Sequence, residues 1–276
     1  MKQQLLNLVK MEKAELQNYM ERHGDTLFPY MLTHLGTIDS ELRDQLIYQA
    51  FCKLITYDLL REEQLAQAFR LIISDEYLMR GIEDGESDEV FTRSFSTLWL
   101  TGLFWIDKQK PFLEQPMRND AFERCATYLL KERDTRGFVE DKGWAHSIAH
   151  GADLAAMIVD HPLIEKKLIP VVLEGITSCF WKGRVYVDDE DERLVAVLMT
   201  LVTAEYEEEV LIEWVEQVFD RLEQKTRVDG YDRSFYHART NSLQFMKTFY
   251  FALKKSHRTP NLRNTVAFFV ERWQNA

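Results

Sequence analysis

Apolar residues recur at helical spacing along nearly the whole chain. Leu211, Val215, Val218 and Leu222, for example, follow an i, i+4, i+7, i+11 pattern. An apolar stripe with this spacing faces a protein core when the segment is an α-helix. No segment shows the strict alternation, bounded by turn residues, that is typical of a half-buried strand. The sequence therefore predicts an all-α protein.

Helix-start and turn signals divide this pattern into segments. With 11 glycines and 6 prolines in 276 residues, the connections should be short. The signals predict an N-terminal helix over about 3–22, then about five helix pairs that begin near Ser40, Asp88, Gly143, Glu190 and Asp232. Their spacing is mostly about 40 to 50 residues, the scale of HEAT or armadillo repeats, although no sequence self-similarity accompanies it. We expect one domain over residues 1–276, built as a right-handed α-solenoid of helix pairs, with an incomplete α/α toroid as the alternative.

The charge balance restricts the partners. The chain has 34 basic and 45 acidic residues, a formal net charge of −11, and one acidic run covers residues 188–192. This field repels nucleic acid and anionic membrane surfaces. It tolerates a metal ion, a small cation or a basic peptide. We expect a protein, peptide or small-molecule ligand, and leave a homo-oligomer open.

The cysteines and the N-terminus predict a cytoplasmic protein. Cys52, Cys125 and Cys179 are odd in number and far apart, which favours free thiols in a reducing compartment. The N-terminus alternates charged and apolar residues, so it lacks a signal-peptide core. The longest uncharged run, Ser94 to Ile106, is too short to span a bilayer.

The segment G-W-A-H-S-I-A-H-G-A-D, Gly143 to Asp153, is the strongest candidate for a site. On a helix, His146, His150 and Asp153 would share one face, where polar groups need partners. Three interpretations are open: structural histidines bonded between helices, a groove for an organic or peptide ligand, or a divalent metal held by His146, His150 and Asp153. The residue after His146 is Ser147, so the catalytic Glu of H-E-x-x-H proteases is absent and no catalytic residue is assigned.

Two loops are expected beside this helix, because stacking places the same edge of successive pairs side by side. Residues 133–141 form either a polar ligand loop ahead of a helix N-terminus or a salt-bridged turn. Residues 188–193 either cap a helix or supply a further metal ligand. A third group of polar residues, which includes Arg239 and Asn241, follows the aromatic residues near 231–236. It either lines a groove or caps a repeat. The candidate ligand-binding residues are Arg133, Arg136, Trp144, His146, His150, Asp153, Asp189, Asp191, Arg239 and Asn241.

Four segments together resemble the bacterial "domain of unknown function 2785" family. They are R-D-x-R-G-F (Arg133–Phe138), the Gly143–Asp153 segment, D-E-D-E-R-L (Asp189–Leu194) and S-D-E-V-F-T-R-S-F (Ser87–Phe95). The likeness runs from about Ser40 to Leu253. The resemblance implies a bacterial, cytoplasmic, all-helical protein and implies no activity.

The sequence contains no complete catalytic set, and a helix-pair solenoid offers a concave binding surface. The leading prediction is therefore a binding or scaffold module with a polar pocket around residues 143–153. The alternative is a metal-dependent hydrolase that uses His146, His150 and an acidic residue.

Overall fold

The computed structural model describes residues 1–274 and is all-helical, as predicted. Within that part of the chain the strands are two short segments, β1 (Phe138–Val139) and β2 (Gly143–Trp144), which pair antiparallel. The helices are α1 (Lys2–Leu8), α2 (Lys13–His34), the π-helical η1 (Glu41–Tyr48), α3 (Gln49–Thr56), α4 (Glu62–Ile72), α5 (Glu89–Gln109), α6 (Gln115–Ala126), α7 (Tyr128–Lys131), α8 (Ser147–Val159), the 3-10 turn η2 (Lys166–Leu168), α9 (Ile169–Cys179), α10 (Glu190–Thr203), α11 (Glu208–Asp229), α12 (Arg233–Ser256) and α13 (Pro260–Gln274).

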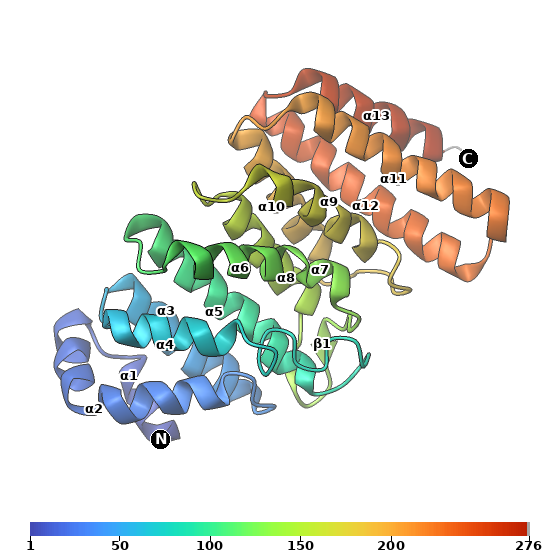
Figure 1. Ribbon diagram of the computed structural model, residues 1–276. Coiled ribbons are helices and arrows are strands. Elements are labelled where there is room, and N and C mark those ends of the chain that lie inside the picture. The colour runs from blue at the N-terminus through green and yellow to red at the C-terminus, as the bar shows by residue number, and fades with distance from the viewer. Residues whose placement is uncertain (275–276) are drawn as a thin grey trace.

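The helices stack in chain order. One row consists of α3, α5, α8, α10 and α12, each packed on the next. On the other side, α4 packs on α5, α7 on α9, and α11 on α13. The two chain ends lie at opposite ends of the stack (Figure 1). Successive helix pairs therefore bring loops that are far apart in sequence to one edge.

Most buried apolar side chains form one cluster that reaches from Leu5 to Trp273, and Val90, Phe91 and Ala145 form a second, small cluster beside the hairpin. Large aromatic rings join neighbouring helices inside the larger cluster. Trp99 of α5, for instance, stacks on Phe51 of α3 with ring centroids 3.9 Å apart. Burying an aromatic side chain of this size is a large apolar contribution to stability. Among residues 1–274, no helix combines the length and the apolar character that a membrane span needs.

Helices begin within about a residue of four of the five positions predicted to start a helix pair. Helix η1 begins at Glu41, α5 at Glu89, α10 at Glu190 and α12 at Arg233. The last of these has the expected cap: the Asp232 carboxylate accepts a 2.7 Å hydrogen bond from the Phe235 amide.

The single N-terminal helix over 3–22 was wrong. The chain forms α1 and α2 instead, with an extended residue at Glu12 between them, and α2 continues to His34. The Lys53 ammonium, from α3, donates to the carbonyls of Val9 (2.9 Å) and Met11 and so satisfies the interrupted backbone. That tertiary contact leaves no trace in the local apolar pattern.

The helix predicted over 144–153 was also wrong at its start. Helix α8 begins only at Ser147, Trp144 belongs to β2, and His146 has left-handed backbone angles (φ 48°, ψ 36°). His146 therefore lies before the helix, and it does not share a helical face with His150. A β-hairpin replaces the first turn, because the Ala145 and His146 amides bond the carbonyls of Gly137 and Arg136 at 2.8 and 3.1 Å.

Candidate ligand-binding site

A buried ion pair fixes the loop that leads into the candidate site. The Arg93 guanidinium of α5 binds the Glu132 carboxylate through two 2.8 Å hydrogen bonds, and both side chains are fully buried. Glu132 also accepts bonds from the amides of Arg133 and Asp134, each 2.9 Å. Charge-assisted bonds of this kind are stronger than neutral ones. The ion pair therefore fixes the position of residues 133–137, which follow α7.

A second buried arginine holds the hairpin. Arg43 of η1 donates to the Lys142 carbonyl at 2.8 Å, and its guanidinium lies over the rings of Phe91 and Phe95, 4.3 and 4.8 Å from their centroids. Gly143 packs so close that an added Cβ would lie 2.8 Å from Ser40 Cβ. The hairpin is thus clamped against η1 and α5.

His146 is held in a conformation that costs free energy. Its left-handed backbone is about 1–2 kcal/mol unfavourable for a residue with a Cβ. Its ring stacks on Trp144, with centroids 4.3 Å apart. The ring nitrogen Nε2 is buried and has no hydrogen-bond partner. A buried polar atom without a partner costs a further 1–3 kcal/mol or so.

Two carboxylates, one from the loop before α10 and one from the first residue of α10, lie near this histidine. One ring nitrogen of His146 and one carboxylate oxygen each of Asp188 and Glu190 lie within 4.8 Å of one another. Asp188 packs on Gly137, where an added Cβ would lie 1.9 Å from Asp188 Oδ2. The Asp188 amide donates a 2.9 Å hydrogen bond to Glu190 Oε2. The predicted approach of the 133–141 and 188–193 loops is therefore confirmed.

Burial dominates the electrostatics of this cluster. Desolvation lowers the pKa of His146, although Asp188 and Asp189 oppose the shift, and so it favours the neutral imidazole. Desolvation also raises the pKa of Glu190, which is 3% exposed. A neutral imidazole keeps a lone pair, and buried acids gain from a positive charge placed between them.

His150 faces a different partner. Its Nδ1 lies 2.7 Å from Ser94 Oγ, and Ser94 donates its hydroxyl proton to the Ala145 carbonyl. Because that proton is used, Nδ1 of His150 is the donor to Ser94. Burial lowers the pKa of His150 to about 3. This arrangement ties α8 to α5 and to the hairpin.

Asp153 lies one turn further along α8 and pairs with Arg193 of α10, whose Nη1 is 3.0 and 3.1 Å from the two carboxylate oxygens. It opens onto a groove of about 700 Å³ over α8, between α5 and α10. Ala156, Met157 and Met199 line its floor. The structure thus places Asp153 at the groove and His146 at the loop cluster, and His146, His150 and Asp153 do not converge on one point.

The other predicted residues have individual partners. Arg136 binds the Asp134 carboxylate and the Ser87 carbonyl, as in a salt-bridged turn, and the side chain of Arg133 is exposed. Asp191 accepts bonds from Gln244 and Thr248 of α12. Asp189 is exposed, with left-handed backbone angles, at the start of α10.

Arg239 and Asn241 lie on α12, away from the cluster. Arg239 binds the Trp273 carbonyl near the C-terminus. Asn241 is buried; it accepts from the Tyr186 amide at 3.0 Å and donates to the Arg184 carbonyl at 2.8 Å. It therefore anchors the segment that delivers Asp188 and contributes to the cluster only indirectly.

An apolar rim lies beside the cluster. Trp144 is 40% exposed and Phe138, edge-on to it at 5.1 Å, is 55% exposed. Val187, next to Asp188, is 78% exposed. Large apolar side chains around a polar centre are a feature of ligand sites.

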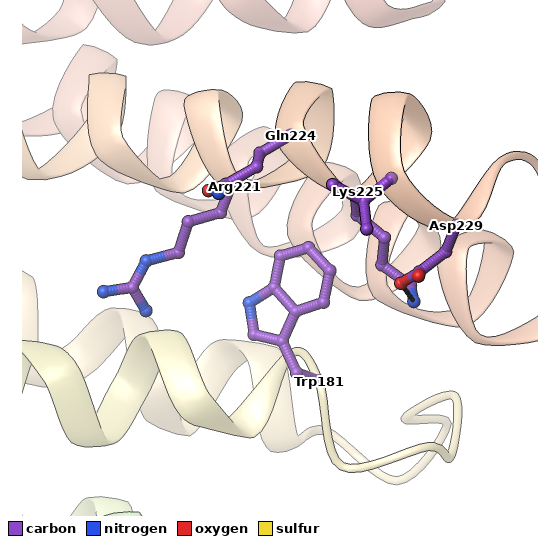
Figure 2. Close-up of a pocket in the computed structure, with 6 residues that line it drawn as sticks. Trp181, Arg221, Gln224, Lys225 and Asp229 are labelled. Atoms are coloured by element: carbon purple, nitrogen blue, oxygen red, sulfur yellow. Dashed lines mark hydrogen bonds and ion pairs between the residues drawn. The ribbon is translucent and has the colours of Figure 1, made fainter.

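A separate pocket of about 370 Å³ lies between the turn after α9 and helix α11 (Figure 2). The Trp181 indole projects between Arg221 and Lys225. Both cations already have partners, Arg221 with Glu174 at 2.8 Å and Lys225 with Asp229 at 3.0 Å. The His146 cluster, which brings three potential ligand atoms within 4.8 Å of one another, is the stronger candidate.

The sequence prediction named the acidic loop but selected alternate residues, Asp189 and Asp191, in place of Asp188 and Glu190. The signal that could have corrected it is the neighbouring Gly137, because a glycine opposite an acidic loop permits the close approach seen here.

No curated protein and no solved structure matches the chain. A family match covers residues 78–251, from within the segment between α4 and α5 to within α12, and so includes the hairpin, α8 and the acidic loop. The chain belongs to the family described as protein of unknown function (DUF2785).

Proposed function

We propose that this protein is a helical-repeat binding module whose ligand site is the junction of residues 133–141, 143–153 and 188–193. The single observation that carries the proposal is His146. A left-handed histidine with a buried, unpartnered nitrogen beside two carboxylates works against stability. Strain and unsatisfied polarity of this kind concentrate at functional sites.

The proposed architecture is the right-handed HEAT-like solenoid rather than the toroid, in one domain. The support is that helices pack on their successors in chain order and that the chain ends lie far apart (Figure 1). The groove over α8 is lined by Asp153, which pairs with Arg193 of α10, and it offers room for a peptide or an apolar part of a ligand. The three free cysteines fit a reducing compartment such as the cytoplasm, which we propose as the location of the protein.

The test is the stability of metal-free variants. His146→Asn removes the unpartnered ring nitrogen and puts in a residue that tolerates left-handed angles, but it loses the stacking on Trp144, worth about 0.5–1.5 kcal/mol. Glu190→Gln keeps an acceptor for the Asp188 amide and removes a charge that burial disfavours. We expect the free energy of unfolding of each variant to lie no more than about 1 kcal/mol below that of the parent.

The matched control is His161→Asn. His161 is 2% exposed, with its Nε2 3.4 Å from Asp107 Oδ2, and serves the core. This variant should lose about 2 kcal/mol or more in urea unfolding. If His146→Asn and Glu190→Gln lose as much as His161→Asn, the cluster is a structural element and the proposal fails.

A metal-dependent hydrolase is the second candidate. The observation that favours it is that His146 has acidic neighbours with ligand atoms at short range. It would rest on His146, Asp188 and Glu190, because His150 is bonded to Ser94 and Asp153 to Arg193. It requires a bound ion that lowers the pKa of a water molecule.

A further inference from the structure

We propose that His146, Asp188 and Glu190 form a binding site for one divalent first-row metal ion of the Mn²⁺ or Zn²⁺ kind. This inference rests on the proposed ligand site and names its ligand. The three residues come from the end of the hairpin, the loop before α10 and the first residue of α10. The fold, and not a local sequence motif, brings them together.

The spacing of the donor atoms suits a single ion. Two ligands on opposite sides of one ion, with bonds of about 2.2 Å, are at most about 4.4 Å apart. The donor atoms of this cluster lie within 4.8 Å of one another. Shifts of a few tenths of an ångström in the side chains therefore close the site, without movement of the backbone.

The surroundings supply the second argument. The Nε2 atom of His146 is buried without a hydrogen-bond partner, and a nitrogen of the same ring lies within 4.8 Å of the two carboxylate oxygens. Few ligands satisfy a buried imidazole lone pair next to two carboxylates. A proton donor such as water does so weakly, whereas a dication binds all three groups and offsets the mutual repulsion of the acids.

The donor set selects the class of metal. One imidazole nitrogen with two carboxylate oxygens suits Mn²⁺, Fe²⁺ and Zn²⁺. Ca²⁺ prefers six to eight oxygen ligands, and Mg²⁺ keeps most of its waters. One imidazole and two carboxylates also leave coordination positions of a four- to six-coordinate ion open. An ion at this place would hold a further small ligand.

The experiment measures binding of Mn²⁺ and Zn²⁺ to untagged, chelator-stripped protein by equilibrium dialysis with elemental analysis. We expect one ion per chain and a loss of affinity of at least tenfold in His146→Asn and in Glu190→Gln. The matched controls are His237→Asn, another histidine of the chain, and Glu192→Gln, an exposed acid in the same turn as Glu190. Both controls should bind as the parent does.

A fluorescence readout places the ion. Trp144 stacks on the His146 ring, so Co²⁺ at the site should quench the Trp144 emission. Trp144→Phe should lose the Co²⁺-dependent fraction while the other five tryptophans still fluoresce. The inference is overturned if no ion binds below millimolar concentration, if the site variants bind as the controls do, or if Ca²⁺ or Mg²⁺ binds more tightly than Mn²⁺ and Zn²⁺. If His146→Asn and Glu190→Gln are nevertheless more stable than His161→Asn in the absence of metal, the proposed ligand site is retained. Only the inference that its ligand is a metal ion is then rejected.

Discussion

The pH dependence of stability should be set in part by His150. Its pKa in the folded protein is about 3, against 6.5 for an ordinary histidine. Between these values the unfolded chain binds a proton that the native state rejects. Stability therefore falls as pH drops from about 6.5 toward 3, and it is insensitive to this group above about pH 7.5. The physical cause is burial, with His150 already used as the donor to Ser94.

The magnitude follows from the two pKa values. The limiting effect of the lowered pKa is about 5 kcal/mol, and roughly half of it is expressed between pH 7.5 and 4.5. The reference is His150→Asn, because its amide can still donate to Ser94 but does not titrate in this range. Both proteins are unfolded in urea at several pH values, with a chelator present throughout.

The parent should lose roughly 2–3 kcal/mol more than His150→Asn between pH 7.5 and 4.5. The variant can be less stable at every pH without affecting the argument, because only the difference in slope reports the titration. Parallel curves for the two proteins would mean that His150 titrates normally in the folded state. The buried hydrogen bond from His150 Nδ1 to Ser94 would then not hold the histidine neutral.

Three further substitutions test the framework of the site. Arg93→Met should cost about 3–5 kcal/mol in urea unfolding, because it leaves the buried Glu132 carboxylate unpaired; a loss below 1 kcal/mol would contradict this. Gly137→Ala should cost about 1–3 kcal/mol and weaken Mn²⁺ binding, since its methyl group would overlap Asp188; unchanged binding would show that Asp188 is not fixed there. Asn241→Leu should cost about 2–4 kcal/mol, because the Tyr186 amide and two carbonyls lose a buried partner, and normal stability would refute that anchoring role.

The sequence predicted the fold at the level of helices because apolar periodicity and capping are local properties. Asp232 with the Phe235 amide is an example, and the start of α12 was found to within a residue. It failed where tertiary contacts override the local pattern. Lys53 stabilises the break between α1 and α2, and the hairpin takes over the backbone bonds that would have extended α8.

The sequence predicted which segments form the site, but it did not predict which acidic residues face His146. The two loops over residues 133–141 and 188–193 were identified, and their proximity is confirmed because Gly137 contacts Asp188. Which acids turn inward depends on the left-handed residue Asp189, which reverses the chain between Asp188 and Glu190. A change of one residue in such a turn redirects every side chain around it, and no spacing rule shows it in advance.

The most direct test of the central claim is the anomalous scattering of crystals of the protein soaked in Mn²⁺, recorded at the manganese edge. The account predicts one strong peak about 2.0–2.3 Å from a ring nitrogen of His146 and from carboxylate oxygens of Asp188 and Glu190. Absence of a peak there, or a peak at Asp153 and Arg193 instead, would contradict it.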